Sequence, residues 1–311
     1  MIGTAFFGEN AMTDRSYILP PRRLLRVSGE DRQSFLQGLV SNDVAKAAPD
    51  RAIWSALLTA QGKFLHDFFL VEQDGAYLLE AEADRLDDLK RRLSLYRLRA
   101  KAAIEAVEGW TVAIAWGDDA LKALDLPGEA GAAKPFGGGV AFADPRLAGA
   151  GARLYLPDVA ALEAAGFTPG DPAAYDRLRI SLGLPDGSRD MQVEKAILLE
   201  NGFDELHGVD WKKGCYVGQE LTARTKYRGL IKKRLLPVGI AGPLPEAGAI
   251  IEAEGKEAGE MRSSVDGPDF ALGLALLRLE ALESGARLTI GDTVLTPLTP
   301  DWVVLPEKKS A

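Results

Sequence analysis

The single cysteine of this chain is the residue with the clearest potential for chemistry. Cys215 follows Lys212 and Lys213 and lies between Gly214 and Gly218. Neighbouring cations stabilise a thiolate, the form of cysteine that reacts and binds metals, and glycine lets the backbone approach a ligand closely. The pattern predicts a reactive thiol assisted by Lys213, although a lone cysteine is also a common inert core residue.

The cysteine belongs to a strongly basic segment. Residues 212–234 carry eight lysines and arginines against one acidic residue, Glu220, which gives +7 in a chain of net charge −8. A solvated basic face is one interpretation of such a segment. The other is a docking surface for a polyanion, either a polycarboxylate tail or RNA.

Two further titratable residues stand together in a predicted strand. His66 alternates with Leu65 and reads as a partly buried strand histidine. Asp67 fits a carboxylate at a strand end or turn, and it fits a ligand contact equally well. The sequence alone leaves both interpretations of Asp67 open.

The residues that follow Cys215 also have two interpretations. Tyr216 is either a core aromatic or a ring that stacks on a planar ligand. Gln219 and Glu220 fit the first turn of a helix, while the alternation over residues 220–226 would equally suit a strand.

The composition limits the kinds of site and compartment. One cysteine and two histidines cannot supply the four ligands of a structural zinc or of an iron–sulfur cluster held by this chain alone, although a shared cluster stays open. A single cysteine also excludes an intramolecular disulfide and indicates a reducing compartment. Residues 1–10 lack the basic start of a secretory signal, and no apolar run approaches the length of a membrane helix. We therefore expect a cytoplasmic protein that does not enter a membrane.

The order of apolar patterns predicts an α+β fold. With 311 residues, 47% hydrophobic and 26% charged, the chain has the composition of a folded protein of one or two domains. A helix is expected around Phe35 to Val40, and another over residues 86–96. Expected strands cover residues 24–27, 52–59, 64–71 and 76–80.

The second half of the chain divides into three patterns. Residues 117–151 are rich in Gly, Ala and Pro and predict a surface loop or an inserted linker. Asp171 and Pro172 predict a helix start, with a stop at Gly183. Short apolar runs separated by Gly and Pro predict a small β-barrel after that. The predicted division is therefore residues 1–234 and 235–311.

Several motifs together resemble one family. Lys213–Glu220, KGCYVGQE, matches the KGCYxGQE signature of the YgfZ family, folate-binding relatives of the glycine-cleavage T-protein. Phe35–Val44 resembles the family's FLQGxxTNDV block, Gln61–Lys63 its QGK turn, and Tyr175–Pro185 its YxxxRIxxGxP helix. Asp301–Trp302 resembles the tail of its barrel. The resemblance covers most of the chain.

The resemblance implies a ring of ferredoxin-like α/β subdomains around a folate-sized hole, followed by a C-terminal β-barrel. It implies an accessory protein of iron–sulfur cluster assembly or repair, sometimes linked to tRNA modification. The cofactor would be tetrahydrofolate or a one-carbon-substituted reduced folate. Expected partners are folate and iron–sulfur assembly proteins or client enzymes, with RNA as a further possibility. Cys215 and Lys213 would carry any catalysis, and the expected folate contacts are Asp67, Glu200, Tyr216, Gln219 and Glu220.

Two positions depart from the T-protein pattern. The GGxxDD turn of T-proteins corresponds to residues 62–67, where His66 replaces the first aspartate. Their LRLEAG helix corresponds to residues 178–183, where Ser181 replaces a pteridine-binding glutamate. A hydroxyl matches the donors and acceptors of a pteridine less well than a carboxylate does, so robust aminomethyl transfer is not expected. The alternative functions are a folate-dependent one-carbon transferase that uses Asp67, and an RNA-interacting protein that uses residues 212–234.

Overall fold

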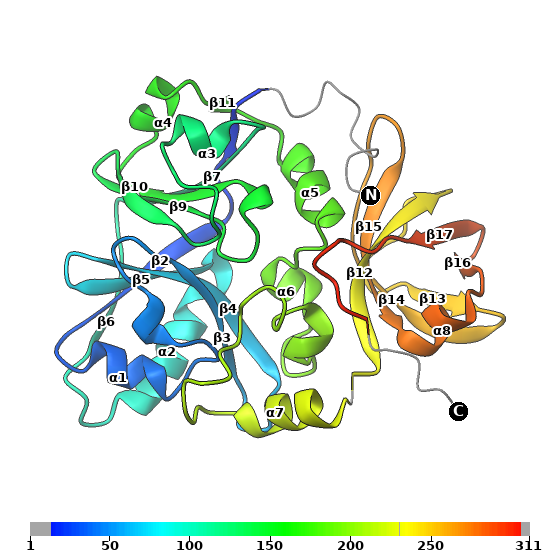
Figure 1. Cartoon of the computed structure of the whole chain (residues 1–311), viewed down its shortest axis with the longest axis horizontal. Helices are drawn as coiled ribbons and strands as arrows, with labels where there is room; N and C mark the ends of the chain where they lie inside the picture. The colour runs from blue at the N-terminus through cyan, green and yellow to red at the C-terminus, as the bar shows by residue number, and fades with distance from the viewer. Residues whose placement is uncertain (1–13, 230, 306–311) are drawn as a thin grey trace.

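Two β-sheets and a closed barrel make up the protein (Figure 1). The computed structural model describes residues 14–229 and 231–305, so the N-terminal stretch inspected for a secretory signal lies outside them. Helices α5 (Pro172–Ser181) and α6 (Gly187–Asp190) stand between the two sheets and the barrel in Figure 1. The mixed composition of helices and strands confirms the predicted α+β class.

The first sheet contains the strands predicted from the N-terminal half. Its five strands pair in the order β3-β4-β5-β2-β6. In that order they are Ile53–Leu58, Phe64–Gln73, Ala76–Glu82, Arg22–Ser28 and Ala103–Ala106. Helices α1 (Arg32–Gln37) and α2 (Leu86–Arg97) accompany the sheet, and α2 packs through three buried leucines at helical spacing. The predicted helix over residues 86–96 is confirmed.

The second sheet corrects one prediction. Its six strands pair in the order β11-β1-β7-β10-β9-β8. They are Thr168–Pro169, Ser16–Ile18, Thr111–Trp116, Ala152–Leu156, Gly139–Ala143 and Ala133–Phe136, with helices α3 (Ala120–Ala123) and α4 (Ala160–Ala164). The prediction of a loop or linker over residues 117–151 is therefore wrong. Strand β9 is buried at every position, so its small residues show no alternation, and the composition resembles that of a loop.

The barrel closes in the order β12-β15-β14-β13-β16-β17 and confirms the predicted C-terminal barrel. Its strands in chain order are Lys233–Ala241, Ile250–Ala253, Lys256–Val265, Ala271–Arg278, Leu288–Ile290 and Thr293–Pro297, and α8 spans Leu279–Ser284. After β17 the chain returns to α5, where the indole Nε1 of Trp302 donates to the carbonyl oxygen of Leu182 at 2.7 Å. Helix α7 (Gln219–Arg228) precedes the barrel along the lower edge of Figure 1. Short 3-10 helices are η1 (Val44–Lys46), η2 (Ala83–Arg85), η3 (Ala148–Ala150) and η4 (Leu198–Asn201). None of the helices in the described ranges has the length and apolar character needed to cross a membrane.

Buried ion pairs join the two sheets. Glu80 on β5 pairs with Arg22 on the neighbouring β2 and with Arg153 on β10 of the other sheet. Arg153 also contacts Asp144, and Arg146 holds the same carboxylate with two hydrogen bonds of 3.0 and 2.7 Å. Burial alone would raise the pKa of Asp144, but Arg146 and Arg153 lower it to about 2. These charged groups are shielded from water, so the free energy of burying each one depends on the ion pairs that it forms.

A buried histidine links the first sheet to α2. His66 is 1% exposed, and its Nε2 lies 2.9 Å from Oδ2 of Asp88. Burial, followed by the nearby guanidinium of Arg85, lowers the pKa of His66 to about 4 against the opposing effect of Asp88. The residue that replaces a T-protein aspartate therefore faces α2 and the interior.

The first prediction concerns the ion pairs between the sheets. Arg153→Met leaves Glu80 and Asp144 each short of a partner in the interior, so we expect a loss of about 3–5 kcal/mol in the free energy of unfolding. The matched control is Arg23→Met on β2, whose pair with Glu108 is exposed, and it should cost at most about 1 kcal/mol. Urea denaturation measures both variants. Similar losses in the two would contradict the importance of the buried network.

The second prediction concerns acid sensitivity. The pKa of His66 falls from 6.5 to about 4 on folding, so the unfolded chain binds the proton more readily between these values. Stability should fall as the pH drops through this window, by up to about 3 kcal/mol from this residue. His66→Gln should flatten the dependence, while His207→Asn, at an exposed position, should not. Urea midpoints at several pH values between 4 and 7 test this, and equal slopes in all three proteins would disprove it.

Candidate functional site

The structure brings the KGCYVGQE segment against the FLQGLVSNDV segment. The backbone N–H of Val217 donates to the carbonyl oxygen of Gly38 at 3.1 Å. Lys213 lies two residues before Cys215. Its Nζ donates to the carbonyl oxygens of Val40 and Asn42, the latter at 2.8 Å. The loop is thus held on both sides of the cysteine.

Gln37 connects the two segments further. Its Nε2 donates to Oδ1 of Asp43 at 2.8 Å and to the carbonyl oxygen of Lys213 at 3.4 Å. Its Oε1 accepts from the backbone N–H of Val44 at 2.8 Å. One amide side chain therefore shapes the turn after α1 and contacts the cysteine loop at the same time.

The QGK turn supports the same loop through two glycines. Gly62 has φ of +81°, and a Cβ there would lie 2.6 Å from the carbonyl oxygen of Gly218. Gly218 also has φ of +81°, and a Cβ there would lie 2.4 Å from the carbonyl oxygen of Thr59. Both positions need glycine for the backbone conformation and for this close approach. The three motifs, distant in sequence, form one structural unit.

Cys215 lies at the exposed part of this unit. It is a free, exposed thiol, and the space around Gly214 is open. The chain then enters helix α7, so Gln219 and Glu220 belong to a helix and the strand alternative is wrong. Oε1 of Gln219 accepts from the backbone N–H of Tyr216 at 2.9 Å and closes the turn between the cysteine and the helix.

Lys213 and Tyr216, which stand on either side of Cys215 in the sequence, are partly buried. Burial lowers the pKa of Lys213 to about 8, although Asp43 and Asp210 act in the opposite direction. Its Nζ sits 5.0 Å from the centre of the Tyr216 ring. Burial raises the pKa of Tyr216 to about 12, and the ring packs against the hydrophobic cluster that contains Trp54 and Phe203. The Lys213 amine makes its hydrogen bonds to two backbone carbonyl groups of the FLQGLVSNDV segment.

Asp67 lies apart from the cysteine loop, in the interior. It is 2% exposed, and its Oδ2 accepts from the indole Nε1 of Trp54 at 3.0 Å. Burial raises the pKa of Asp67, with Arg22 opposing the shift. Trp54 in turn stacks on Phe203, with 3.8 Å between the ring centres. A ligand that contacts Asp67 would require these rings to move.

Glu200 is the remaining predicted contact. It lies in η4, where burial raises its pKa against the backbone N–H groups of Lys232 and Lys233. Glu220 is exposed on the first turn of α7. Ser181, at the end of α5, donates its hydroxyl to the carbonyl oxygen of Leu178 at 2.7 Å. Glu200 therefore contacts the backbone that leads into β12, the first strand of the barrel.

The basic segment is less uniform than its sequence suggests. Arg234 is 1% exposed and binds Glu205 and the carbonyl oxygen of Leu199, so it does not belong to a surface. Lys226 pairs with Asp204. Four exposed cations of the segment form no ion pair with another described residue, and they are Lys212, Arg224, Arg228 and Lys232. A docking surface would rest on these four.

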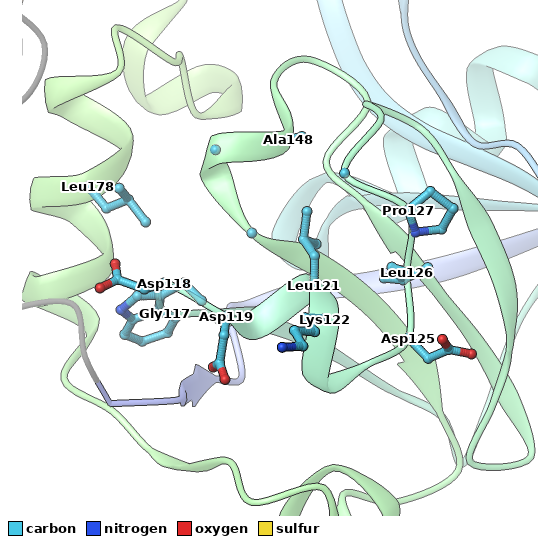
Figure 2. Close-up of a pocket in the computed structure, with 14 residues that line it drawn as sticks. Gly117, Asp118, Asp119, Leu121, Lys122, Asp125, Leu126, Pro127, Ala148 and Leu178 are labelled. Carbon is cyan, nitrogen blue, oxygen red and sulfur yellow. The ribbon is translucent and has the colours of Figure 1, made fainter.

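A cavity of about 830 Å³ lies elsewhere, between α3 and the second half of α5 (Figure 2). Asp118, Asp119 and Lys122 lie at its lower side, and Pro127 and Ala148 at its upper side in Figure 2. No residue of the predicted site lines it. Within residues 14–229 and 231–305, no group of three or more His, Cys, Asp or Glu side chains is placed to hold a metal ion.

Sequence reasoning missed two parts of this site. Gln37 was noted only as part of the FLQGLVSNDV motif. Nothing else in the sequence indicates its contact with the cysteine loop. Asp210 was not singled out, yet its carboxylate accepts from the backbone N–H of Lys212 and pairs with Lys46. An aspartate two residues before a lysine pair is a local signal for such a turn.

Comparison with known proteins identifies relatives of this chain. Residues 232–305 match the family model "CAF17, C-terminal beta-barrel domain". The chain is 34% identical over 308 residues to the human mitochondrial iron-sulfur cluster assembly factor IBA57, covering 91% of this chain and 84% of that protein. The mouse protein of the same name is 32% identical over 312 residues, covering 91% of this chain and 84% of that protein.

A solved structure shares the fold. The aminomethyltransferase T of the glycine cleavage system from Bartonella henselae superposes with a TM-score of 0.75, covering 94% of this chain and 87% of that chain. The sequences are 17% identical, so the likeness concerns the fold. The predicted T-protein-type fold is confirmed.

The relatives also correct the predicted location. The human and mouse proteins are named as mitochondrial, and this contradicts the prediction of a cytoplasmic protein. The prediction failed because a low cysteine count indicates a reducing compartment but does not distinguish one such compartment from another.

The identity to the human protein extends over most of both chains. The chain belongs to the family of the iron-sulfur cluster assembly factor IBA57.

Proposed function

We propose that this protein is an accessory factor of iron–sulfur cluster assembly that supplies Cys215 as one ligand of a cluster shared with a partner. The observation that carries the proposal is the exposed thiol on a loop held on both sides by the FLQGLVSNDV segment. Relatives of the same family are named as assembly factors.

The number of ligands explains why a partner is required. Cysteine-ligated clusters need about four protein ligands, and this chain has one cysteine. The Cys215 thiol releases its proton when it binds iron as the thiolate, and the remaining ligands come from the partner. An accessory protein of this kind offers one well-placed ligand and releases the cluster when the partner withdraws.

The surroundings of the thiol suit this role. The exposed cations Lys212 and Arg224 lie in the segments on either side of Cys215, and a thiolate-ligated cluster carries negative charge. Lys213 and Gln37 fix the loop to the body of the protein. A fixed thiol loses little conformational entropy when a cluster binds.

Reduced folate is our proposal for a second ligand. The T-protein fold supports it, and Glu200, Tyr216 and the exposed cations of residues 212–232 remain the proposed contacts. The alternative of a one-carbon transferase has less support, because its surviving carboxylate, Asp67, is enclosed by Trp54. An RNA or tRNA-modification role rests on the four exposed cations alone, and it is the weaker alternative.

The third prediction tests the thiol. Anaerobic addition of ferrous iron, sulfide and glutathione to the purified chain should produce the visible absorption and circular dichroism of a cluster, with glutathione supplying the other thiolates. Cys215→Ser should abolish these signals and leave the melting temperature unchanged, because the side chain is exposed.

A matched control tests the position of the thiol. Ser94 is exposed on α2, so Cys215→Ser combined with Ser94→Cys keeps one exposed thiol but moves it. The double variant should form no more cluster than Cys215→Ser. Cluster formation equal to that of the wild-type protein in either variant would remove Cys215 from the proposed function.

The fourth prediction concerns folate. Calorimetry should detect one tetrahydrofolate per chain, with tighter binding of the triglutamate form at low salt, because a polycarboxylate tail would meet Lys212, Arg224, Arg228 and Lys232. The gain should decline as salt is added. Equal affinity of the two forms at low salt would contradict the electrostatic contribution, and no binding below millimolar concentration would remove folate from the proposal.

A further inference from the structure

A second cavity, of about 400 Å³, lies away from the cysteine loop. It opens between the chain from Tyr17 to Arg22 and one face of helix α5, with Pro185 to Arg189 closing one side. Its size is within the range typical of small-molecule sites. Neither Cys215 nor any predicted folate contact lines it.

Guanidinium groups form the floor of this cavity. The lining includes four buried arginines, Arg22, Arg146, Arg153 and Arg179, each at most 8% exposed. Glu80, Asp144 and Asp190 pair with these arginines and do not line the cavity. Asp176 and Asp186 do line it, and they pair with Arg179 and Arg22.

A buried hydroxyl points to a missing polar partner in the same place. Tyr175 lines the cavity and is 5% exposed, yet its Oη has no hydrogen-bond partner among the described residues. Burial raises the pKa of this hydroxyl, while Arg153 acts in the opposite direction. Nη2 of Arg22 is likewise buried without a hydrogen-bond partner among those residues. Buried polar groups are nearly always paired in folded proteins.

Other residues of the wall are apolar. They include Tyr17, Ile18 and Ile114, and they include five prolines, Pro20, Pro21, Pro169, Pro172 and Pro185. Prolines and an aromatic ring offer flat surfaces that change little on binding. A few convergent donors within apolar walls are typical of a site for a small organic molecule.

We propose that this cavity binds a small organic anion, with its carboxylate or phosphate group at the Tyr175 hydroxyl and the arginine floor and its flat apolar body between the prolines and Tyr17. Tyr175 and Arg22 donate to the anion, and charge-assisted bonds of this kind are strong and directional. Asp186 and Asp176 at the cavity wall exclude larger polyanions, since further negative charge would meet these carboxylates.

The fifth prediction tests the site with defined probes on the full chain. Benzoate and phenyl phosphate carry the two anionic groups on the same ring, and benzamide is the neutral control. Calorimetry should show that at least one anion binds at least tenfold more tightly than benzamide. Whichever anion binds more tightly identifies the class of the natural ligand.

Tyr175→Phe separates ligand binding from folding. The variant removes only an oxygen that has no partner among the described residues, so its melting temperature should equal or exceed that of the wild-type protein. Its affinity for the better anion should fall at least fivefold. The control Tyr227→Phe removes an exposed hydroxyl on α7 and should change neither quantity. The proposal is wrong if neither anion binds better than benzamide, or if Tyr175→Phe binds it as well as the wild-type protein does.

Discussion

The buried ion pairs between Glu80, Arg153 and Asp144 are the constraint on which the arrangement of the two sheets depends. Hydrophobic surfaces can slide over one another at little cost, whereas a buried guanidinium must keep its carboxylates at hydrogen-bond distance. The ring of Phe69 lies 3.6 Å from the guanidinium carbon of Arg153, so the same residue also packs on the face of β4. The position of one sheet therefore fixes that of the other.

This constraint determines where a functional site can lie. The face of β4 that carries Asp67 is closed by Trp54, Phe203 and the arginines. Chemistry that needs access is left to the turn at the other end of the β3–β4 hairpin, where Gly62 meets Gly218. The exposed thiol lies beyond this contact, on the part of the chain that leads to α7. The separation allows a rigid interior and an accessible ligand in the same molecule.

The sequence predicted those features that depend on local patterns. Alternation and helical spacing identified β4 and α2, and the Asp171–Pro172 pair identified the start of α5, where Oδ1 of Asp171 accepts from the backbone N–H of Ala173. The strands over residues 133–143 were not predicted, because β9 is buried at every position and shows no alternation, and the Gly residues around it have the composition of a linker. The acceptors of Lys213 and the burial of Arg234 depend on residues far away in the chain, and no local pattern contains that information.

Trp302 has a consequence for how the molecule is made. Its indole packs against Gly183 and Gly202, caps α5 through Leu182, and faces the guanidinium of Arg234. It is also packed against the hydrophobic cluster that both sheets build. The last segment of the chain thus completes an interior whose other members are synthesised much earlier. During translation, this apolar surface of the sheets stays exposed until residue 302 has left the ribosome. A nascent chain with such a surface exposed is a natural substrate for chaperones.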